Sequence, residues 1–551
     1  MNKKLFTFLC SALVAQMAFA QTGSIKGSVL DSNGQPVIGA TIQVVGSKQA
    51  TVSDIDGNFT IPNVDAKSTV SISYLGMQTV TVKATDKMQV VLKDDYQNLE
   101  DVVVIGYGSA KAKDLTSPIT VVKASDIQAV PSASPMTALQ GKVAGVNVIS
   151  SGSPGSAPTV RIRGAGSFKN SSPLYVVDGM FYDDITFLNN DDIQDFTILK
   201  DASAAAIYGV RAANGVVLIT TKKGAKNQKA QITYDGYVGF QKASNVLELC
   251  NAKEYATMML EGNYDTYVSH FKKSIDNYGG SYADPDFHNW TYNTDNDWYD
   301  LMLRTALITN HSVSIAGGSD KSTYSLGGSY LYQDGIMDVD NNYKRLNFRA
   351  AVDYNATNWL KVGFNGVFSQ SEQQVPNNAA WQKAFNCPPI VALYDENNSN
   401  TFPNKYGSPD VLGYTSNFYN PIAFAEYFDS KNESYQALTN FYAQVDFIPN
   451  KLNLRSNYSY SFLSTQGREF TPAYYVSSWQ QSATTKLKKS EDKYYNRIWD
   501  NTLTYNDQFG KHKVGAMVGM SMREEQWRNL NGSTSNVPDG EKEYWYIKNG
   551  N

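Results

Sequence analysis

Apolar and polar residues alternate with a period of two along most of the chain from residue 231 onward. This alternation predicts β-strands that place one row of side chains in apolar surroundings and the other row in polar surroundings. The clear segments are residues 231–241, 323–333, 345–354, 360–368, 452–462 and 514–520, and the weaker ones are residues 310–318, 437–448 and 494–506. The pattern therefore predicts about nine strands in this region.

The links between these segments are alternately short and long. The short links are residues 319–321, 355–358, 449–451 and 507–511, and the long ones are residues 242–309, 334–342, 371–436 and 464–493. Outer-membrane β-barrels have short periplasmic turns, long extracellular loops and strands of about 9–11 residues. A soluble β-sandwich would also alternate apolar and polar residues, but the unequal links and the aromatic strand ends favour the barrel.

Residues 22–94 form a separate region of short alternating segments, which predicts a small β-sandwich. Asn33-Gly34 and Asp56-Gly57 are its turn dipeptides. The expected core residues are Ile25, Val29, Val37, Ile42, Val44, Phe59, Ile61, Val70, Ile72, Val80 and Val82. Residues 54–57 resemble the start of a calcium loop, but the later ligands are missing, so a hairpin turn is the preferred interpretation.

Residues 117–224 mix helical and strand patterns, which predicts a compact α/β domain. A short helix running into a strand is expected at residues 138–148, and further strands at residues 159–164, 174–179 and 215–221. Arg161 and Arg163 should lie on one face of their strand. An alanine-rich helix should begin near Asp201 and end at Gly209, since glycine commonly stops a helix.

The linker at residues 95–116 contains one apolar run, which consists of Asp101, Val102, Val103, Val104, Ile105, Gly106, Tyr107 and Gly108. A strand that runs into Gly-x-Gly could open a dinucleotide-binding unit, but Lys111 occupies the position that needs a small residue. Pro118 then interrupts any helix. We therefore interpret the run as an extended segment whose free backbone edge recruits a strand from a partner.

Residues 1–20 have the pattern of a secretory signal peptide. Two lysines precede an apolar stretch, and residues 18–20 form an A-x-A cleavage site, so cleavage is expected after Ala20. Lipoprotein processing at Cys10 is the weaker alternative, because Cys10 lies inside the apolar run and lacks small residues before it.

Composition narrows the classes of function. A net charge of −4 gives no basic footprint for nucleic acid. Three cysteines and four scattered histidines argue against a disulfide framework and a His-rich metal site. Because no nucleophile elbow, phosphate loop or metal-ligand spacing occurs, we expect no enzyme activity, no cofactor and no metal. The 40 Gly, 36 Tyr and 24 Phe, with 18% charged residues, suit amphipathic strands with aromatic edges.

Three sets of residues resemble known families. Residues 27–61, GSVLDSNGQPVIGATIQVVGSKQATVSDIDGNFTI, resemble the carboxypeptidase-regulatory-like domain, a β-sandwich without a catalytic role. The stretches LQGKVAGVNV, VRIRGAGS, PLYVVDG and ILKDASAAAIYGVRAANGVVLITTKKG resemble the plug of the SusC/RagA family of TonB-linked outer-membrane transporters. Residues 101–107 resemble the TonB box that precedes such a plug. The resemblance implies a mainly β protein with an N-terminal sandwich, an α/β plug and a transmembrane β-barrel.

The same resemblance implies active import of a nutrient, an oligosaccharide or a peptide, across the outer membrane. The expected partners are TonB, contacting residues 101–107, a SusD-like surface lipoprotein and the outer-membrane lipid. A receptor or adhesin that binds its ligand without transport is the alternative. Barrels of this kind have about 22 strands. About nine strands by the period-two criterion therefore lead us to expect a truncated chain with an incomplete barrel over residues 231–551.

The long link at residues 242–309 carries Trp290, Tyr292, Trp298 and Tyr299. Aromatic rings in an extracellular loop could stack on a glycan, which makes these four residues candidates for ligand binding. Ordinary packing of the loop would use the same residues and is the preferred interpretation.

Overall fold

The computed structural model describes residues 22–31, 34–45, 47, 49–65, 68–74, 77, 79–85, 87–92, 102–105, 108–111, 119–128, 130–166, 171–201, 205–510 and 512–550. The predicted signal peptide, residues 1–20, lies outside this part of the chain. The chain divides into two compact units, one built mainly from residues up to 103 and the other mainly from residue 115 onward.

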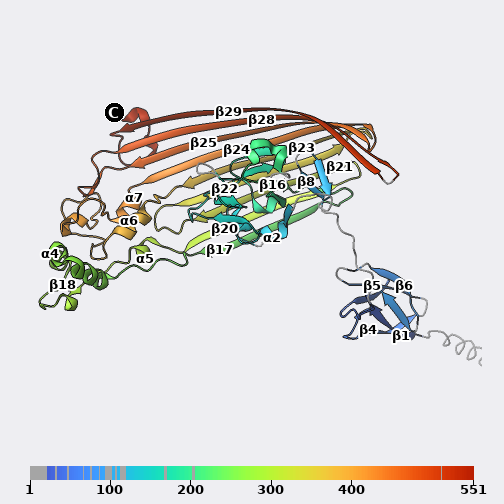
Figure 1. The fold of residues 1–551 in the computed structure, drawn as a ribbon, viewed down its shortest axis with the longest axis horizontal. Coiled ribbons are helices and arrows are strands. Elements are labelled where there is room, and N and C mark those ends of the chain that lie inside the picture. Colours follow the sequence, from blue (N-terminus) through green and yellow to red (C-terminus); the bar gives the residue numbers. More distant parts are fainter. Residues whose placement is uncertain are drawn as a thin grey trace, which may run out of the picture. The chain divides into compact units, whose positions relative to one another are not determined.

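The first unit contains a β-sandwich of two sheets (Figure 1). Its described strands are β1 (Thr22–Leu30), β2 (Thr41–Val44), β3 (Ala50–Val52), β4 (Asn58–Asp65), β5 (Thr69–Ser73), β6 (Val80–Lys83) and β7 (Met88–Val91), in the orders β4-β1-β7 and β3-β2-β5-β6. The predicted core residues are buried between the sheets, except Val80 and Val82, which are partly buried against the same cluster. Asp54 accepts hydrogen bonds from the backbone N–H groups of Asp56 and Asn58, which confirms a turn at this position. The strands on either side of it, β3 and β4, belong to different sheets, so the turn joins the two sheets and the predicted hairpin is wrong.

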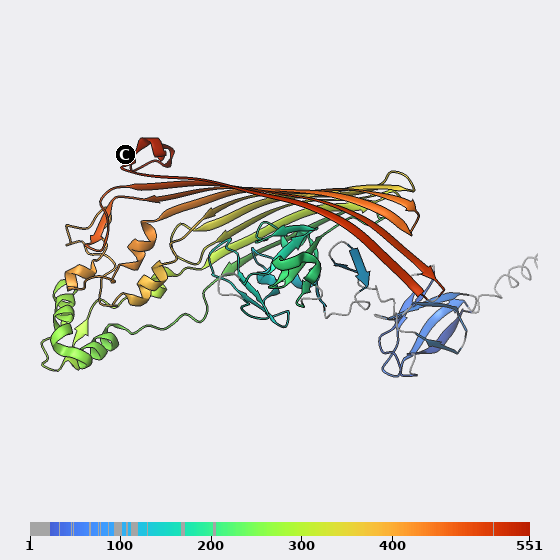
Figure 2. The ribbon, with the colours of Figure 1, turned by 45° about the horizontal axis from the view of Figure 1, so that its top comes forward.

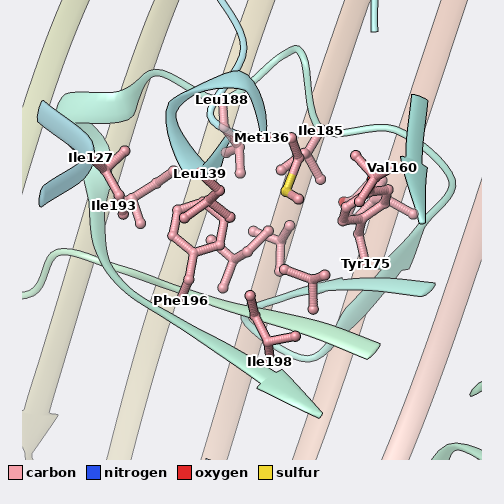
Figure 3. Close-up of a cluster of buried hydrophobic side chains, with 14 of the residues drawn as sticks. Ile127, Met136, Leu139, Val160, Tyr175, Ile185, Leu188, Ile193, Phe196 and Ile198 are labelled. Atoms are coloured by element: carbon pink, nitrogen blue, oxygen red, sulfur yellow. The ribbon is translucent and has the colours of Figure 1, made fainter. Parts of the chain in front are cut away.

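The second unit begins with an α/β domain, residues 119–224, which we call the inner domain. Its elements are β10 (Ile119–Lys123), α2 (Ala124–Gln128), η2 (Thr137–Leu139), β11 (Val146–Ile149), β12 (Thr159–Ile162), β13 (Leu174–Val177), β14 (Met180–Tyr182), η3 (Asn190–Asp192), β15 (Ile193–Leu199), η4 (Ala206–Ala212) and β16 (Val216–Thr221). The main sheet has the order β10-β15-β16-β13-β14, in which β13 and β16 are parallel. Figure 3 shows its core, where side chains such as Leu139, Phe196 and Ile198 pack together.

The expected alanine-rich α-helix that ends at Gly209 differs from the structure. The 3-10 helix η4 continues to Ala212, and Gly209 lies inside it with φ 63° and ψ −152°. This backbone conformation is open mainly to glycine, so Gly209 breaks the helical path as expected but does not end the segment. Residues 202–204 of the predicted helix lie outside the described residues.

Nine described strands form one antiparallel sheet in which each strand pairs with its neighbours in sequence. They are β17 (Gln231–Gln241), β20 (Ala306–Gly318), β21 (Ser322–Asp334), β22 (Asn342–Asn355), β23 (Leu360–Gln374), β24 (Asp429–Ile448), β25 (Leu452–Thr471), β28 (Lys486–Phe509) and β29 (His512–Ser535). Figure 2 shows this large sheet curving over the inner domain. The sheet is open, with β17 and β29 at its two edges.

The two faces of the large sheet have opposite character. The face turned away from the inner domain, which we call the outer face, exposes large apolar side chains such as Val238 (64% exposed) and Phe348 (52%). The face toward the inner domain, the inner face, buries polar side chains such as Arg345, Asn347 and Arg349. A soluble sandwich would bury the apolar row instead, so this inversion supports the predicted barrel wall.

The connections between the strands of the large sheet alternate in length. Residues 319–321, 356–359, 449–451 and 510–511 form the short ones, and residues 242–305, 335–341, 375–428 and 472–485 the long ones. The long ones carry α4 (Ala252–Tyr278), α5 (Trp298–Met302), α6 (Ala380–Asn386) and α7 (Pro421–Glu426), with the small pairs β18 (Gly280–Ser281), β19 (Thr291–Tyr292) and β26 (Tyr474–Ser477), β27 (Gln480–Ser482). Within the described residues, no helix combines the length and the apolar character needed to cross a membrane.

Candidate functional site

The contact between the inner domain and the inner face of the large sheet combines an apolar part, in which Val367, Leu438 and Ile498 of the wall join the core of the inner domain, with a network of polar side chains. Arg349 of β22 projects its guanidinium toward the inner domain, where Nε donates to Asp192 Oδ1 at 2.9 Å. Its Nη2 donates to Ser325 Oγ at 2.9 Å, and Nη1 donates to the backbone carbonyl of Lys222. Both charged side chains are almost fully buried, at 1% and 7% exposure. The charges are therefore paired and hydrogen-bonded, as a buried ion pair requires.

The neighbouring polar residues of the sheet hold the backbone of one segment of the inner domain. Arg345 Nη1 donates to the carbonyls of Ala133 and Thr186, and Asn347 Nδ2 donates to the carbonyl of Phe187 at 2.8 Å. Since Arg345, Asn347 and Arg349 alternate along β22, their side chains reach the same face and all contact residues 186–192. Arg345 and Arg349 also bind the carbonyls of Ala133 and Lys222.

Asp191 lies beside this ion pair and is held by the neighbouring strand β20. Asn310 Nδ2 donates to Asp191 Oδ2 at 2.9 Å. Burial raises the pKa of the Asp191 carboxyl above its ordinary value, while the hydrogen bond from Asn310 opposes that shift. Residues 186–192 therefore contact the wall through the backbone carbonyls of Thr186 and Phe187 and through the carboxyl groups of Asp191 and Asp192.

A tight turn between β13 and β14 forms a second contact with the wall. Asp178 and Gly179 have positive φ values of 47° and 92°, as the two-residue turn of a hairpin requires. The Asp178 carboxylate accepts hydrogen bonds from Thr221 Oγ1 at 2.8 Å and from Asn365 Nδ2 of β23. Asn440 Nδ2 of β24 donates to the Asp178 carbonyl at 2.9 Å. One turn is thus joined to two strands of the wall.

A third contact joins η4 to the edge strand β29. Arg211 Nη1 lies 3.0 Å from Glu525 Oε1, and Tyr494 OH donates to the same carboxylate oxygen at 2.7 Å. Both partners of this pair keep about a third of their side-chain surface (34% and 39%). Because water screens such a pair, loss of one partner costs little here, whereas loss of one partner of the buried Arg349–Asp192 pair leaves an uncompensated buried charge.

A recess of about 350 Å³ lies between the inner domain and the wall. The inner domain lines it with the turn at residues 155–157 and with Asp184, Thr186 and Phe187. The wall lines it with inner-face residues of β22, β23, β24 and β25, most of which carry hydroxyl or amide groups. Over the described residues, no three His, Cys, Asp or Glu side chains come together in a way that could hold a metal ion.

The structure describes part of the predicted TonB-contact segment. Val102–Ile105 form β8, which pairs with β9 (Gly108–Lys111) in a two-stranded sheet. Asp101, Gly106 and Tyr107 lie outside the described residues. TonB contact at this segment stays a prediction.

The four aromatic residues proposed for ligand binding lie in a region that we call the loop domain, residues 242–305 and 375–428. Trp298 is fully buried and donates from Nε1 to the Pro388 carbonyl at 3.1 Å. Trp290 is also buried, at 3% exposure, whereas Tyr292 and Tyr299 pack against the same cluster and keep part of their surface. The burial of both tryptophans fits the packing interpretation, and ligand binding at this site stays a prediction.

The residues that make the polar contacts at the inner face were not predicted as a functional site from the sequence. Arg345, Asn347 and Arg349 appeared only as the polar row of a predicted strand. The sequence did contain one indication of these contacts, namely two arginines in the polar row of one barrel strand, because charges inside a barrel need partners.

Two sequence profiles match the N-terminal part of the chain. The profile of the CarboxypepD_reg-like domain matches residues 25–104, and that of the TonB-dependent Receptor Plug Domain matches residues 111–216. The second match covers most of the inner domain, so the element that the polar contacts hold against the wall is similar to a plug.

Known proteins resemble the chain over most of its length. TonB-dependent receptor P3 of Formosa agariphila is 32% identical over 542 residues, which cover 95% of this chain and 50% of that protein. TonB-dependent receptor SusC of Bacteroides thetaiotaomicron is 34% identical over 436 residues, covering 76% of this chain and 41% of that protein. The chain thus spans about half the length, or less, of these relatives.

Solved structures show the same fold. The structure of the RagAB peptide transporter superposes with a TM-score of 0.65 at 23% identity, over 79% of this chain and 50% of that one. The correspondence places the inner domain and the curved sheet in one known architecture, a domain enclosed by a β-barrel wall.

Proposed function

The chain belongs to the TonB-dependent receptors of the SusC/RagA type, and we propose that it serves the TonB-dependent import of an oligosaccharide or a peptide across the outer membrane. The observation that carries this proposal is the polar contact between the inner domain, here the plug, and the wall. The contact also has an apolar part at Val367, Leu438 and Ile498, and that part loses its hydrophobic stabilisation when the plug moves into water. Hydrogen bonds to Arg345, Asn347 and Arg349 can be exchanged for bonds to water, so a plug held by them can be displaced and return.

Work on the plug enters from the periplasmic side in this proposal. The signal peptide directs secretion and is removed by cleavage after Ala20, and the mature N-terminus lies in the periplasm. The segment Asp101 to Tyr107 pairs with TonB as an added strand, which joins the edge of β8 opposite to the one that pairs with β9. TonB transmits a pull to the plug, which begins shortly after this segment in the sequence. The pull opens the contacts at residues 178–192 and lets the ligand pass.

The ligand arrives from the side of the long connections. We place a SusD-like lipoprotein there as partner, since relatives of the SusC type and the RagAB assembly share this architecture. The loop domain is the described part of the chain that faces such a partner, because its segments follow β17 and β23 on the side of the long connections.

Uptake of a labelled ligand tests the proposal. Accumulation of the labelled ligand is compared between native host cells with and without functional TonB, and binding of the ligand at the cell surface is measured in parallel. Uptake that requires TonB supports import. Binding that persists while accumulation is absent in both strains would instead establish a receptor or adhesin without transport.

A further inference from the structure

Asp191 of the plug and Asn310 of the wall form a contact in which one polar atom has no partner. Asn310 lies on the inner face of β20 and is 4% exposed, and its Nδ2 donates to Asp191 Oδ2 at 2.9 Å. The other polar atom of the same amide, Asn310 Oδ1, is fully buried and meets no hydrogen-bond donor among the described residues. A buried acceptor without a donor costs free energy, so the contact is one hydrogen short of full satisfaction.

The Asp191 carboxyl group can supply that hydrogen. Its hydrogen bonds both reach Oδ2, from Asn310 Nδ2 and, at 3.4 Å, from Asn189 Nδ2. This leaves Oδ1 open to a proton. An ionised carboxylate only accepts hydrogen bonds, whereas a carboxylic acid also has an O–H group that donates. A protonated Asp191 therefore has the donor that Asn310 Oδ1 lacks.

The surroundings of Asp191 favour uptake of a proton. Burial raises the pKa of its carboxyl group, and the hydrogen bond from Asn310 lowers it. The negative charge of Asp235 on β17 raises the pKa, the positive charge of Lys222 lowers it, and the charge of Asp192 raises it. The net direction is upward. Asp191 keeps part of its surface, so a proton can reach it from water.

The other ionisable groups near this contact have partners or carry no charge. Arg349 is paired with Asp192, and Arg345 donates to the carbonyls of Ala133 and Thr186. Tyr237 on β17 interacts electrostatically with Asp191, and its phenol is neutral from about pH 5 to about pH 8. None of these groups offers Asp191 a free positive charge.

We propose that Asp191 and Asn310 form a proton-dependent latch, which holds the plug to the wall more firmly in acid. A proton from water adds to Asp191 Oδ1, and the new O–H group donates to Asn310 Oδ1. Asn310 Nδ2 keeps its bond to Asp191 Oδ2. One hydrogen bond across the contact becomes two, and a partly buried negative charge is removed.

The direction of the pH effect follows from the difference between the docked and the released plug. Release exposes Asp191 to water and returns its pKa toward the ordinary value of about 4. Because the docked plug binds the proton more tightly, docking strengthens as the pH falls through the raised pKa, and the gain is complete below the ordinary value. The Arg349–Asp192 pair responds in the opposite sense, since protonation of Asp192 removes one of its charges.

Hydrogen exchange at residues 186–192 tests the latch. The full-length protein is purified from outer membranes of its native host and measured at about pH 8 and about pH 5. Exchange is expressed as protection factors, which correct for the intrinsic pH dependence of the exchange rate and report local opening. Asp191→Asn gives the group a permanent donor, and Asn310→Ala removes its partner. Asp126→Asn, at an exposed carboxyl of α2, is the matched control.

We expect protection in the unmodified protein and in Asp126→Asn to be about threefold or more higher at the acid pH. Asp191→Asn should be highly protected at both pH values, because its amide always donates, and Asn310→Ala should be weakly protected at both. Protection that falls on acidification in the unmodified protein, or an acid gain that persists in Asp191→Asn or Asn310→Ala, would overturn the latch. So would weak protection of Asp191→Asn at both pH values. Because no uptake is measured, either result leaves the import function untouched.

Discussion

Arg349 illustrates how a single residue positions the plug. Its guanidinium and the Asp192 carboxylate are both nearly fully buried, which costs desolvation energy that their attraction and the bonds to Ser325 and Lys222 offset. Such a pair adds little net stability compared with apolar side chains, but loss of one partner leaves an uncompensated buried charge. The pair therefore specifies where residues 186–192 dock.

Removal of the arginine tests this interpretation. Arg349→Met should destabilise the plug–wall contact by about 3–5 kcal/mol, because the Asp192 carboxylate stays buried without its partner. Arg211→Met, which removes a pair with about a third of its surface exposed, should cost about 1 kcal/mol or less. Hydrogen exchange of residues 186–192 measures the first effect, and Arg349→Met/Asp192→Asn should recover part of it. Equal protection in the two single variants would contradict the assignment.

Gly209 is the second residue whose role depends on its backbone. Its φ of 63° and ψ of −152° are unfavourable for residues with a side chain, although no atom lies within 4 Å of an added Cβ. Gly209→Val should therefore destabilise η4 by on the order of 1 kcal/mol or more through strain alone. The neighbouring Val210→Ala, at a side chain that is 93% exposed, is the matched control. Identical protease resistance around residues 205–212 in both variants would rule out the strain.

At the scale of elements, the strands of the large sheet differ in length, and some are longer than a membrane span requires. A tilted strand needs about 9–11 residues to span the hydrocarbon, whereas β24 and β25 have 20 residues and β28 and β29 have 24. In the membrane arrangement of the proposed function, β24, β25, β28 and β29 therefore continue well beyond the bilayer. The strands β17 and β23 are shorter, and the two segments of the loop domain follow directly after them.

In the proposed function, energy coupling runs through the segment that contains the strand β8. Val103→Pro should abolish TonB-dependent uptake, because proline removes a backbone donor and disfavours pairing with an added strand. Surface binding of the ligand should be unchanged, since Val103 and the loop domain lie in different units. Val103→Thr, which keeps the donor and suits a strand, is the control and should transport normally. Full uptake with Val103→Pro would show that residues 101–107 do not pair with TonB in this way.

At the scale of the whole molecule, the open edges of the large sheet limit what residues 1–551 can do alone. β17 and β29 each pair with a neighbour on one side only. An unsatisfied backbone N–H or C=O group in hydrocarbon costs several kcal/mol, so a stable barrel has no free edge. The described strands therefore need further strands, from the same or another chain, to enclose the plug within a membrane.

A chain of residues 1–551 produced alone should fail to appear as a heat-resistant, protease-protected monomer in outer membranes. Its two strand edges would remain unpaired in the bilayer. The outcome is measured by heat-modifiability on gels and by protease protection in intact cells. The protein produced by its native host serves as the reference. A stable monomer with a protected sheet would require the large sheet to close by a pairing that this structure lacks.

Local pattern was enough to predict much of this fold. The period-two alternation identified all nine described strands of the large sheet, because each strand presents one row to an apolar and one to a polar environment. The sandwich core and the buried strand at residues 216–221 followed from the same rule. The helix α4 was not expected within its long link, and an interior break at Asn263 (φ −161°, ψ 90°) interrupts its regular pattern.

The sequence by itself determined where the nine strands lie, which links are short or long, and which family the plug resembles, since these depend on neighbours along the chain. It did not determine how far the strands extend, because β25, β28 and β29 continue into residues that were expected to form a long link and a tail. Only the tertiary structure decided which polar residues hold the plug and which line the recess. Arg349 and Asp192 are 157 residues apart, and Phe187 and Gln436 meet across the same cavity. Such pairings arise when the sheet curves around the plug, and no local periodicity encodes them.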